Sequence, residues 1–208
     1  MRSAIPAVCL FLTLVAFAPA GEDPNVFRSV TVGFEVVKPS SWHFVTAEQN
    51  LESLKQTKLN DKEFHKLMLN YAKAPLVAIM KYPEPFDDLN PSFKVNIRPL
   101  GQMKGADPRE ILVMLSGQFK KILKDYRAEM SPVVTLVAGL PTGYLRAHYT
   151  LETNEGRSFA VTSELWIVPR GDYFFMIGAG TRQDEATGSR REIREILKTI
   201  RITSREGP

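Results

Sequence analysis

The 208-residue sequence contains a single cysteine, Cys9, which lies in an apolar N-terminal segment. Arg2 precedes a nearly continuous apolar run, and Ala18-Pro19-Ala20 has the small-x-small pattern of a signal-peptidase site. The run is shorter than the roughly 20 residues that a membrane-spanning helix needs. We therefore predict a signal peptide over residues 1–20, cleaved near Ala20, and an exported protein that is periplasmic or extracellular.

Cleavage leaves 188 residues without cysteine, which excludes thiolate catalysis, disulfide bonds and thiolate metal sites in the mature chain. A chain of this length can build a hydrophobic core without covalent cross-links. We predict one domain over residues 30–203, preceded by a flexible lead-in at 21–29 and followed by a polar tail at 204–208.

Several other features are scarce. The mature chain has a formal net charge of +3 with the two signs interspersed, which argues against a nucleic-acid-binding protein. No Gly-x-Ser-x-Gly motif, no phosphate-binding glycine fingerprint and no His-x-x-x-His spacing occurs. The sequence therefore predicts no catalytic residue, no metal site and no cofactor.

The feature that organises the chain is an apolar hairpin at residues 158–180. Phe159, Val161 and Leu165 share one face of its first strand, but Trp166 makes the other face apolar as well. In the second strand both faces are apolar, which predicts a sheet covered on both sides. Pro169 and Gly171 suit a tight turn between the two strands.

Alternating apolar residues, turn signals and helical stripes divide the rest of the chain into elements. Trp42 is predicted to pack at the edge of the sheet. Asp107-Pro108-Arg109-Glu110 is a strong helix start, with a cap, a first-position proline and an acidic first turn. The predicted strands are 30–36, 76–82, 93–99, 133–137, 144–153 and a short extended piece at 200–202. The predicted helices are 47–71 in two pieces, 107–126 and a last helix that carries Ile193, Ile196, Leu197 and Ile200.

In this order the elements resemble the PsbP-like superfamily, the bacterial and chloroplast relatives of an extrinsic photosystem II subunit. The resemblance rests on four motifs: Gly33-Phe34 with Pro39-x-x-Trp42, Gly139-Leu140-Pro141-x-Gly143-Tyr144, Tyr173-Phe174-Phe175-Met176-Ile177-Gly178, and the closing segment 196–202. It implies an α+β fold, an α/β/α sandwich around a mostly antiparallel sheet. It also implies a protein that binds rather than catalyses, and it transfers no functional residue.

Two surface features are candidate contacts with a partner. The loop at 83–91 has the composition of an exposed, proline-bounded loop, and such loops often carry function. The last helix has basic residues spaced along one face, which suit an acidic protein or anionic lipid heads. The candidate partner-binding residues are Glu84, Phe86, Asp87, Asp88, Arg190, Arg194 and Lys198.

The leading hypothesis is a non-catalytic exported domain that contacts a protein partner in the cell envelope, with peripheral membrane contact left open. The first alternative is an envelope hydrolase that brings His43, His65 or His148 together with a carboxylate in the folded chain. The second alternative is a carrier of a small ligand or a metal, for which Glu84, Asp87 and Asp88 offer oxygen ligands without the spacing of a known calcium loop.

Overall fold

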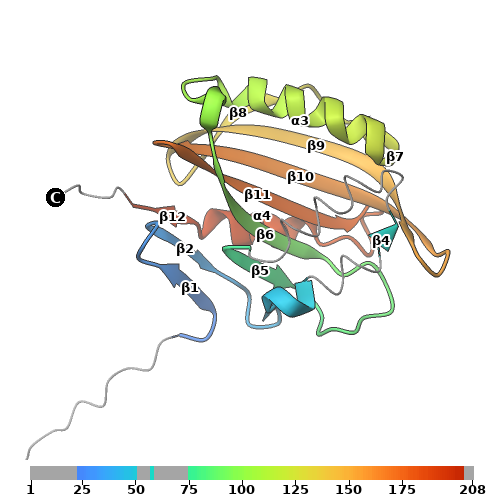
Figure 1. Ribbon diagram of the computed structural model, residues 1–208. Helices are drawn as coiled ribbons and strands as arrows, with labels where there is room; N and C mark the ends of the chain where they lie inside the picture. Colours follow the sequence, from blue (N-terminus) through green and yellow to red (C-terminus); the bar gives the residue numbers. More distant parts are fainter. Residues whose placement is uncertain (1–22, 51–56, 59–74, 204–208) are drawn as a thin grey trace, which may run out of the picture.

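The computed structural model describes residues 23–50, 57–58 and 75–203, and Figure 1 shows a large curved sheet with helices on its two faces. The predicted signal peptide, the polar tail and most of the predicted helical segment 47–71, His65 included, lie outside the described residues. The strand order of the large sheet is β3-β5-β6-β11-β10-β9-β4, and β7 and β8 both pair with β9. All of these pairings are antiparallel.

Three long strands form the centre of the sheet, and shorter strands flank them. The predicted hairpin is the pair β10–β11, and β9 and β6 pair with its outer edges. The strands of the large sheet are β3 (His43–Phe44), β4 (Thr57–Lys58), β5 (Val77–Met80), β6 (Ser92–Pro99), β7 (Lys124–Ala128), β8 (Val133–Val137), β9 (Leu140–Thr153), β10 (Ser158–Arg170) and β11 (Tyr173–Arg182).

Helix α3 (Pro108–Ile122) covers one face of the sheet over β9 and β10, after the short 3-10 helix η1 (Gly101–Met103). Its start is as predicted, because the Asp107 side chain accepts a hydrogen bond from the Arg109 backbone N at 2.8 Å and Pro108 is at the first position. The apolar face of α3 and the sheet below it form a core cluster. Its buried members are Leu100, Ile111, Leu112, Leu145, Ile167 and Phe174.

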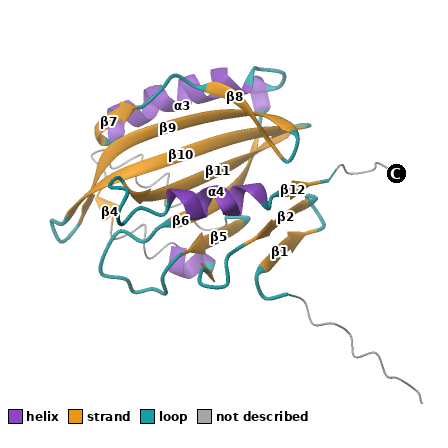
Figure 2. Ribbon diagram, turned by 180° about the vertical axis from the view of Figure 1, so that it is seen from behind, coloured by secondary structure: helices purple, strands orange, loops and turns teal. Residues whose placement is uncertain are grey.

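The opposite face is covered by helix α4 (Arg190–Lys198) and by a small sheet of β1 (Val26–Ser29), β2 (Phe34–Val37) and β12 (Arg201–Ile202), as Figure 2 shows. Trp42 is fully buried in this layer, which confirms the prediction that it packs on the sheet. The largest side chains of the second core cluster are Phe34, Trp42, Ile79, Phe93, Trp166, Phe175, Ile177, Ile193, Ile196 and Ile200.

The two clusters explain why the central hairpin is apolar on both faces. Ile167 packs toward α3, whereas its neighbours Trp166 and Val168 pack in the layer that contains α4. Alternate residues of a strand point to opposite faces, so a sheet between two apolar layers needs apolar residues at successive positions. The predicted fold class, an α/β/α sandwich around a mostly antiparallel sheet, is confirmed.

The N-terminal part differs from the prediction. Residues 26–29, placed in the flexible lead-in, form strand β1 and pair with β2. The predicted strand 30–36 is instead a turn followed by β2, and Val30 in that turn is 85% exposed. Gly33 has a φ of +64° and lies against Thr203. The alternating apolar residues at 30–36 therefore belong to a turn and to β2. The strand that pairs with β2 lies before them in the chain, at 26–29.

Three further boundaries differ. Pro169 is not in the turn but pairs with Phe174 inside the hairpin, whose loop is Gly171-Asp172. Helix α3 ends at Ile122 rather than near Tyr126, because Tyr126 belongs to strand β7. The Tyr126 side chain contacts the helix, with its hydroxyl 2.8 Å from that of Ser116. Thr57 and Lys58 lie within the segment predicted as helical, but they form the short strand β4.

Gly143 in β9 allows α3 to approach the sheet closely. A Cβ atom at this position would lie 2.5 Å from the carbonyl oxygen of Pro108, a backbone atom that cannot rotate away. The motif glycine at 143 therefore has a packing role: it lets the first turn of the helix rest directly on the strand.

We expect Gly143→Ala to lower the free energy of unfolding by about 1–3 kcal/mol, because the helix start must move away from the sheet. Gly117→Ala is the matched control, because Gly117 lies in α3 and has open space around its Cβ position. Gly117→Ala should leave the free energy of unfolding unchanged or raise it by up to about 1 kcal/mol. Urea unfolding followed by circular dichroism measures both, and equal midpoints for the two variants would contradict the assignment.

Candidate functional site

The loop at 83–91 is held in place by its own side chains. The Glu84 carboxylate accepts hydrogen bonds from the Phe86 backbone N at 3.1 Å and from Asn90 Nδ2 at 2.9 Å. The Phe86 ring stacks on Tyr82 with 4.3 Å between the ring centroids. Glu84 and Phe86, both predicted as contact residues, thus shape the loop from inside.

Two arginines, Arg182 at the end of β11 and Arg157 in the turn between β9 and β10, fix the loop to the sheet. Asp88 accepts a hydrogen bond from Arg182 of β11 at 3.0 Å, and the backbone carbonyl of Asp87 accepts one from Arg157. The guanidinium groups of both arginines lie over the Phe159 ring. Of the predicted loop residues, Asp87 is exposed and forms no ion pair among the described residues, whereas the carboxylate of Asp88 is paired with Arg182.

The start of α4 lies at the same end of the molecule as this loop. Lys81, immediately before the loop, contacts Ser189 at 3.1 Å and Glu192 at 2.6 Å. Burial alone would raise the pKa of Glu192, but hydrogen bonds from Lys81, Trp42 and Ser189 hold it below its usual value. The predicted loop and the predicted helix are therefore neighbours, linked through Lys81.

The predicted basic face of α4 is only partly available to a partner. Arg190 is half-buried, and its Nε lacks a hydrogen-bond partner among the described residues. Lys198 pairs with Glu195 at 2.7 Å. Arg194 is exposed, and so is Arg191, which the sequence prediction omitted. Within the part of the chain that the structure describes, Arg191 and Arg194 form no ion pair, so they are the exposed, unpaired cations of this helix.

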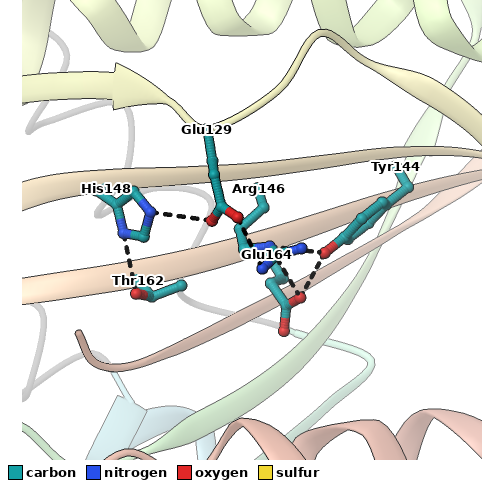
Figure 3. Close-up of polar contacts among 6 residues, drawn as sticks. All are labelled: Glu129, Tyr144, Arg146, His148, Thr162 and Glu164. Atoms are coloured by element: carbon teal, nitrogen blue, oxygen red, sulfur yellow. Dashed lines mark hydrogen bonds and ion pairs between the residues drawn. The ribbon is translucent and has the colours of Figure 1, made fainter. Parts of the chain in front are cut away.

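The sequence did not reveal a second cluster, which lies across β9 and β10 (Figure 3). We call it the hairpin network; it consists of Glu129, Tyr144, Arg146, His148, Thr162 and Glu164. The members on β9 and β10 alternate along their strands and therefore share one face. Tyr144 stacks on Trp166 of the α4-side core, with 5.3 Å between their ring centroids, so the network continues that layer.

Glu164 is the buried end of the hairpin network, with 2% of its surface exposed. One carboxylate oxygen accepts a hydrogen bond from the Tyr144 hydroxyl at 2.5 Å and lies 3.7 Å from Arg146 Nε. Burial, together with the hydrogen bond to Glu164, raises the pKa of Tyr144 to about 12, so the phenol stays protonated and donates at neutral pH. The other oxygen, Oε2, is buried without a hydrogen bond among the described residues.

The exposed end of the hairpin network contains a histidine between an acid and a hydroxyl. His148 Nε2 lies 3.0 Å from Glu129, and its Nδ1 lies 3.0 Å from the hydroxyl of Thr162. Glu129 also pairs with Arg146 at 3.0 Å. A signal for this cluster exists in the sequence: polar residues at 144, 146 and 148 alternate with Leu145 and Ala147.

The three histidines do not form a common site in the part that the structure describes. His43 is in β3 at one edge of the sheet and His148 is in β9, with β5, β6, β11 and β10 between their strands. Over the described ranges, no group of three or more His, Cys, Asp or Glu side chains is arranged to hold a metal ion. No described helix is long and apolar enough to cross a membrane.

Comparison with solved structures identifies the fold. The chain is similar to LpqN of Mycobacterium tuberculosis, a protein involved in cell envelope biogenesis, with a TM-score of 0.50 and 16% identity over 82% of this chain and 83% of LpqN. It is also similar to the cyanobacterial PsbP protein (CyanoP) of Synechocystis, with a TM-score of 0.50 and 9% identity over 89% of this chain and 98% of CyanoP. No family model and no curated protein sequence matches the chain.

These similarities show a PsbP-like fold, as the sequence motifs predicted. At such identities they establish the fold alone.

We expect Arg146→Met to lower the free energy of unfolding by about 3 kcal/mol, because it leaves the buried Glu164 carboxylate without its cation. Arg194→Met is the matched control: it removes the same charge from an exposed position without an ion pair, and we expect a change within about 0.5 kcal/mol. Chemical denaturation at neutral pH measures both. A loss below 1 kcal/mol for Arg146→Met would show that the hairpin network does not stabilise the fold.

Proposed function

We propose that this chain is an exported, non-catalytic accessory domain that binds an acidic surface of a protein partner in the cell envelope. The observation that carries the proposal is the pair of exposed guanidinium groups on α4, Arg191 and Arg194. Other basic side chains of this region are paired with carboxylates, Lys81 with Glu192, Lys198 with Glu195 and Arg182 with Asp88, and Arg190 is half-buried. We call the exposed side of α4 that carries Arg191 and Arg194 the α4 surface.

A rigid support strengthens the proposal. Ile193 and Ile196 are each only 1% exposed and fix α4 on the sheet, so its outer side is held in one orientation. The Thr181 hydroxyl accepts a hydrogen bond from the Ser189 backbone N at 2.8 Å, which fixes the start of the helix. Because the helix backbone is already fixed, binding through its outer side loses little backbone entropy, and the planar guanidinium group of arginine is well suited to contacts with carboxylates.

Three further points support this function. The first twenty residues have the pattern of a signal peptide, which supports export of the mature chain. LpqN, whose fold is similar, is involved in cell envelope biogenesis. The loop at 83–91 adjoins the start of α4 through Lys81 and offers Asp87 as an additional contact.

A second candidate function, envelope hydrolysis, is favoured by one observation: His148 lies between Glu129 and Thr162 as a base lies between an orienting acid and a hydroxyl nucleophile. The burial of Thr162 opposes it, because this side chain is 2% exposed and a nucleophile must reach its substrate. The accessory function is therefore the better supported of the two.

We expect reversal of both arginines, Arg191→Glu with Arg194→Glu, to reduce cross-linking to the partner by about tenfold or more, because like charges then oppose each other. The measurement is chemical cross-linking of the tagged protein in its native envelope, followed by identification of the recovered protein. Lys120→Glu with Lys121→Glu changes the net charge equally on α3 and should leave recovery unchanged. Equal recovery with both double variants, or no recurrent partner, would overturn the proposal.

The hydrolase alternative has its own test. If His148 has no catalytic role, His148→Ala should leave any esterase or peptidase activity of the purified chain unchanged, and it should cost about 1–2 kcal/mol of stability through the lost hydrogen bonds. His43→Ala, at an exposed position, is the control for stability. A hydrolytic activity that disappears in His148→Ala, while the fold is retained, would favour the enzyme instead.

A further inference from the structure

Strand β8 forms an open edge of the large sheet. Among the described residues it pairs with β9 on one side and with no strand on the other, and Figure 1 shows it at the border of the sheet beside α3. Two of its five residues expose apolar side chains: Val134 is 47% exposed and Leu136 is 66% exposed. An uncovered strand edge of this kind is a template for pairing with another strand.

The turn between β8 and β9 determines which backbone groups face outward. Ala138 and Gly139 form a two-residue loop and have φ values of 51° and 76°, as in a type I′ turn. In such a hairpin the flanking pair Val137–Leu140 is hydrogen-bonded, and hydrogen-bonded and non-hydrogen-bonded pairs alternate along the strand. The backbone N–H and C=O groups of Val134 and Leu136 therefore point away from β9, toward the open edge.

The neighbouring strand β7 lies along the same border but is protected. It contains Lys124, Asp125 and Arg127, and its register with β9 shifts between Lys124 and Arg127. Charged residues and bulges are the usual means of keeping an edge strand from pairing with another chain. Strand β8 has neither feature, which sets it apart as a pairing surface.

The sequence of β8, Val-Val-Thr-Leu-Val, is complementary to itself when two copies run antiparallel. With Thr135 opposite Thr135 of a second copy, Val134 lies opposite Leu136 and Val133 opposite Val137. In this register the four outward backbone groups of each strand bond to those of the other, and none remains unpaired. The arrangement has two-fold symmetry, which is the commonest symmetry of protein dimers.

The charge distribution favours a second copy over an oppositely charged partner. Residues 131–145 contain no charged side chain, although the whole chain has 27 basic and 23 acidic residues. Two identical charged edges would repel each other, whereas this uncharged edge brings no like charges together. We propose that β8 pairs with β8 of a second copy of this chain, with Thr135 on the two-fold axis, so that two sheets join into one.

A single engineered cysteine tests the register. Opposed residues of a non-hydrogen-bonded antiparallel pair have Cα atoms about 4.5 Å apart, within the span of a disulfide bond. In a chain with Cys9→Ser, no native cysteine remains. Thr135→Cys should then form a disulfide-linked dimer under mild oxidation. Ser131→Cys is the matched control, because its copies would lie roughly 20 Å or more apart in the proposed register.

A charge placed on the edge tests the surface itself. Added to the Thr135→Cys chain, Val134→Lys should reduce the dimer fraction about fivefold or more, since edge lysines prevent strand pairing. Val30→Lys, at an exposed valine in the β1–β2 turn, should leave the fraction unchanged. Equal cross-linking at positions 131 and 135, no cross-linking at 135, or cross-linking at 135 only to a different protein would each overturn the proposal.

Discussion

The structure depends on one constraint: the central hairpin is apolar on both faces and must be covered on both. Helix α3 covers one face, and α4 with the small sheet of β1, β2 and β12 covers the other. The sandwich follows from this arrangement, since a single layer would leave Trp166 or Ile167 in water. The close approach of α3 at Gly143 is a consequence of the same constraint.

The hairpin also positions the charged residues. Where β9 and β10 extend beyond α4, the face that holds Trp166 continues as the hairpin network, in which Glu164 is buried among Tyr144 and Arg146. At the end of β11, Arg182 holds the loop at 83–91 through Asp88. The α4 surface is thus the part of this region where basic side chains are left without an acidic partner among the described residues.

The sequence predicted the layers well and the functional surface only in part. Asp107-Pro108 marked the start of α3, because capping is local chemistry. Arg194 was predicted and found exposed, whereas Arg190 is half-buried and Lys198 is paired, because helical spacing does not reveal which cations meet a carboxylate. Glu164 was not singled out, since its burial depends on Tyr144 and Arg146 of another strand.

By itself the sequence determined the fold class, the two-sided burial of the central hairpin and the positions of most helices and strands. These depend on periodicity, turn residues and caps, all of which act over a few neighbouring residues. Only the tertiary structure decided that β1 pairs with β2, that Pro169 lies within a strand and that the loop at 83–91 adjoins α4. It also decided that, among the described residues, β8 pairs on one side only. Each of these requires contacts between residues that are distant in the chain or belong to neighbouring strands, and local propensity does not specify such contacts.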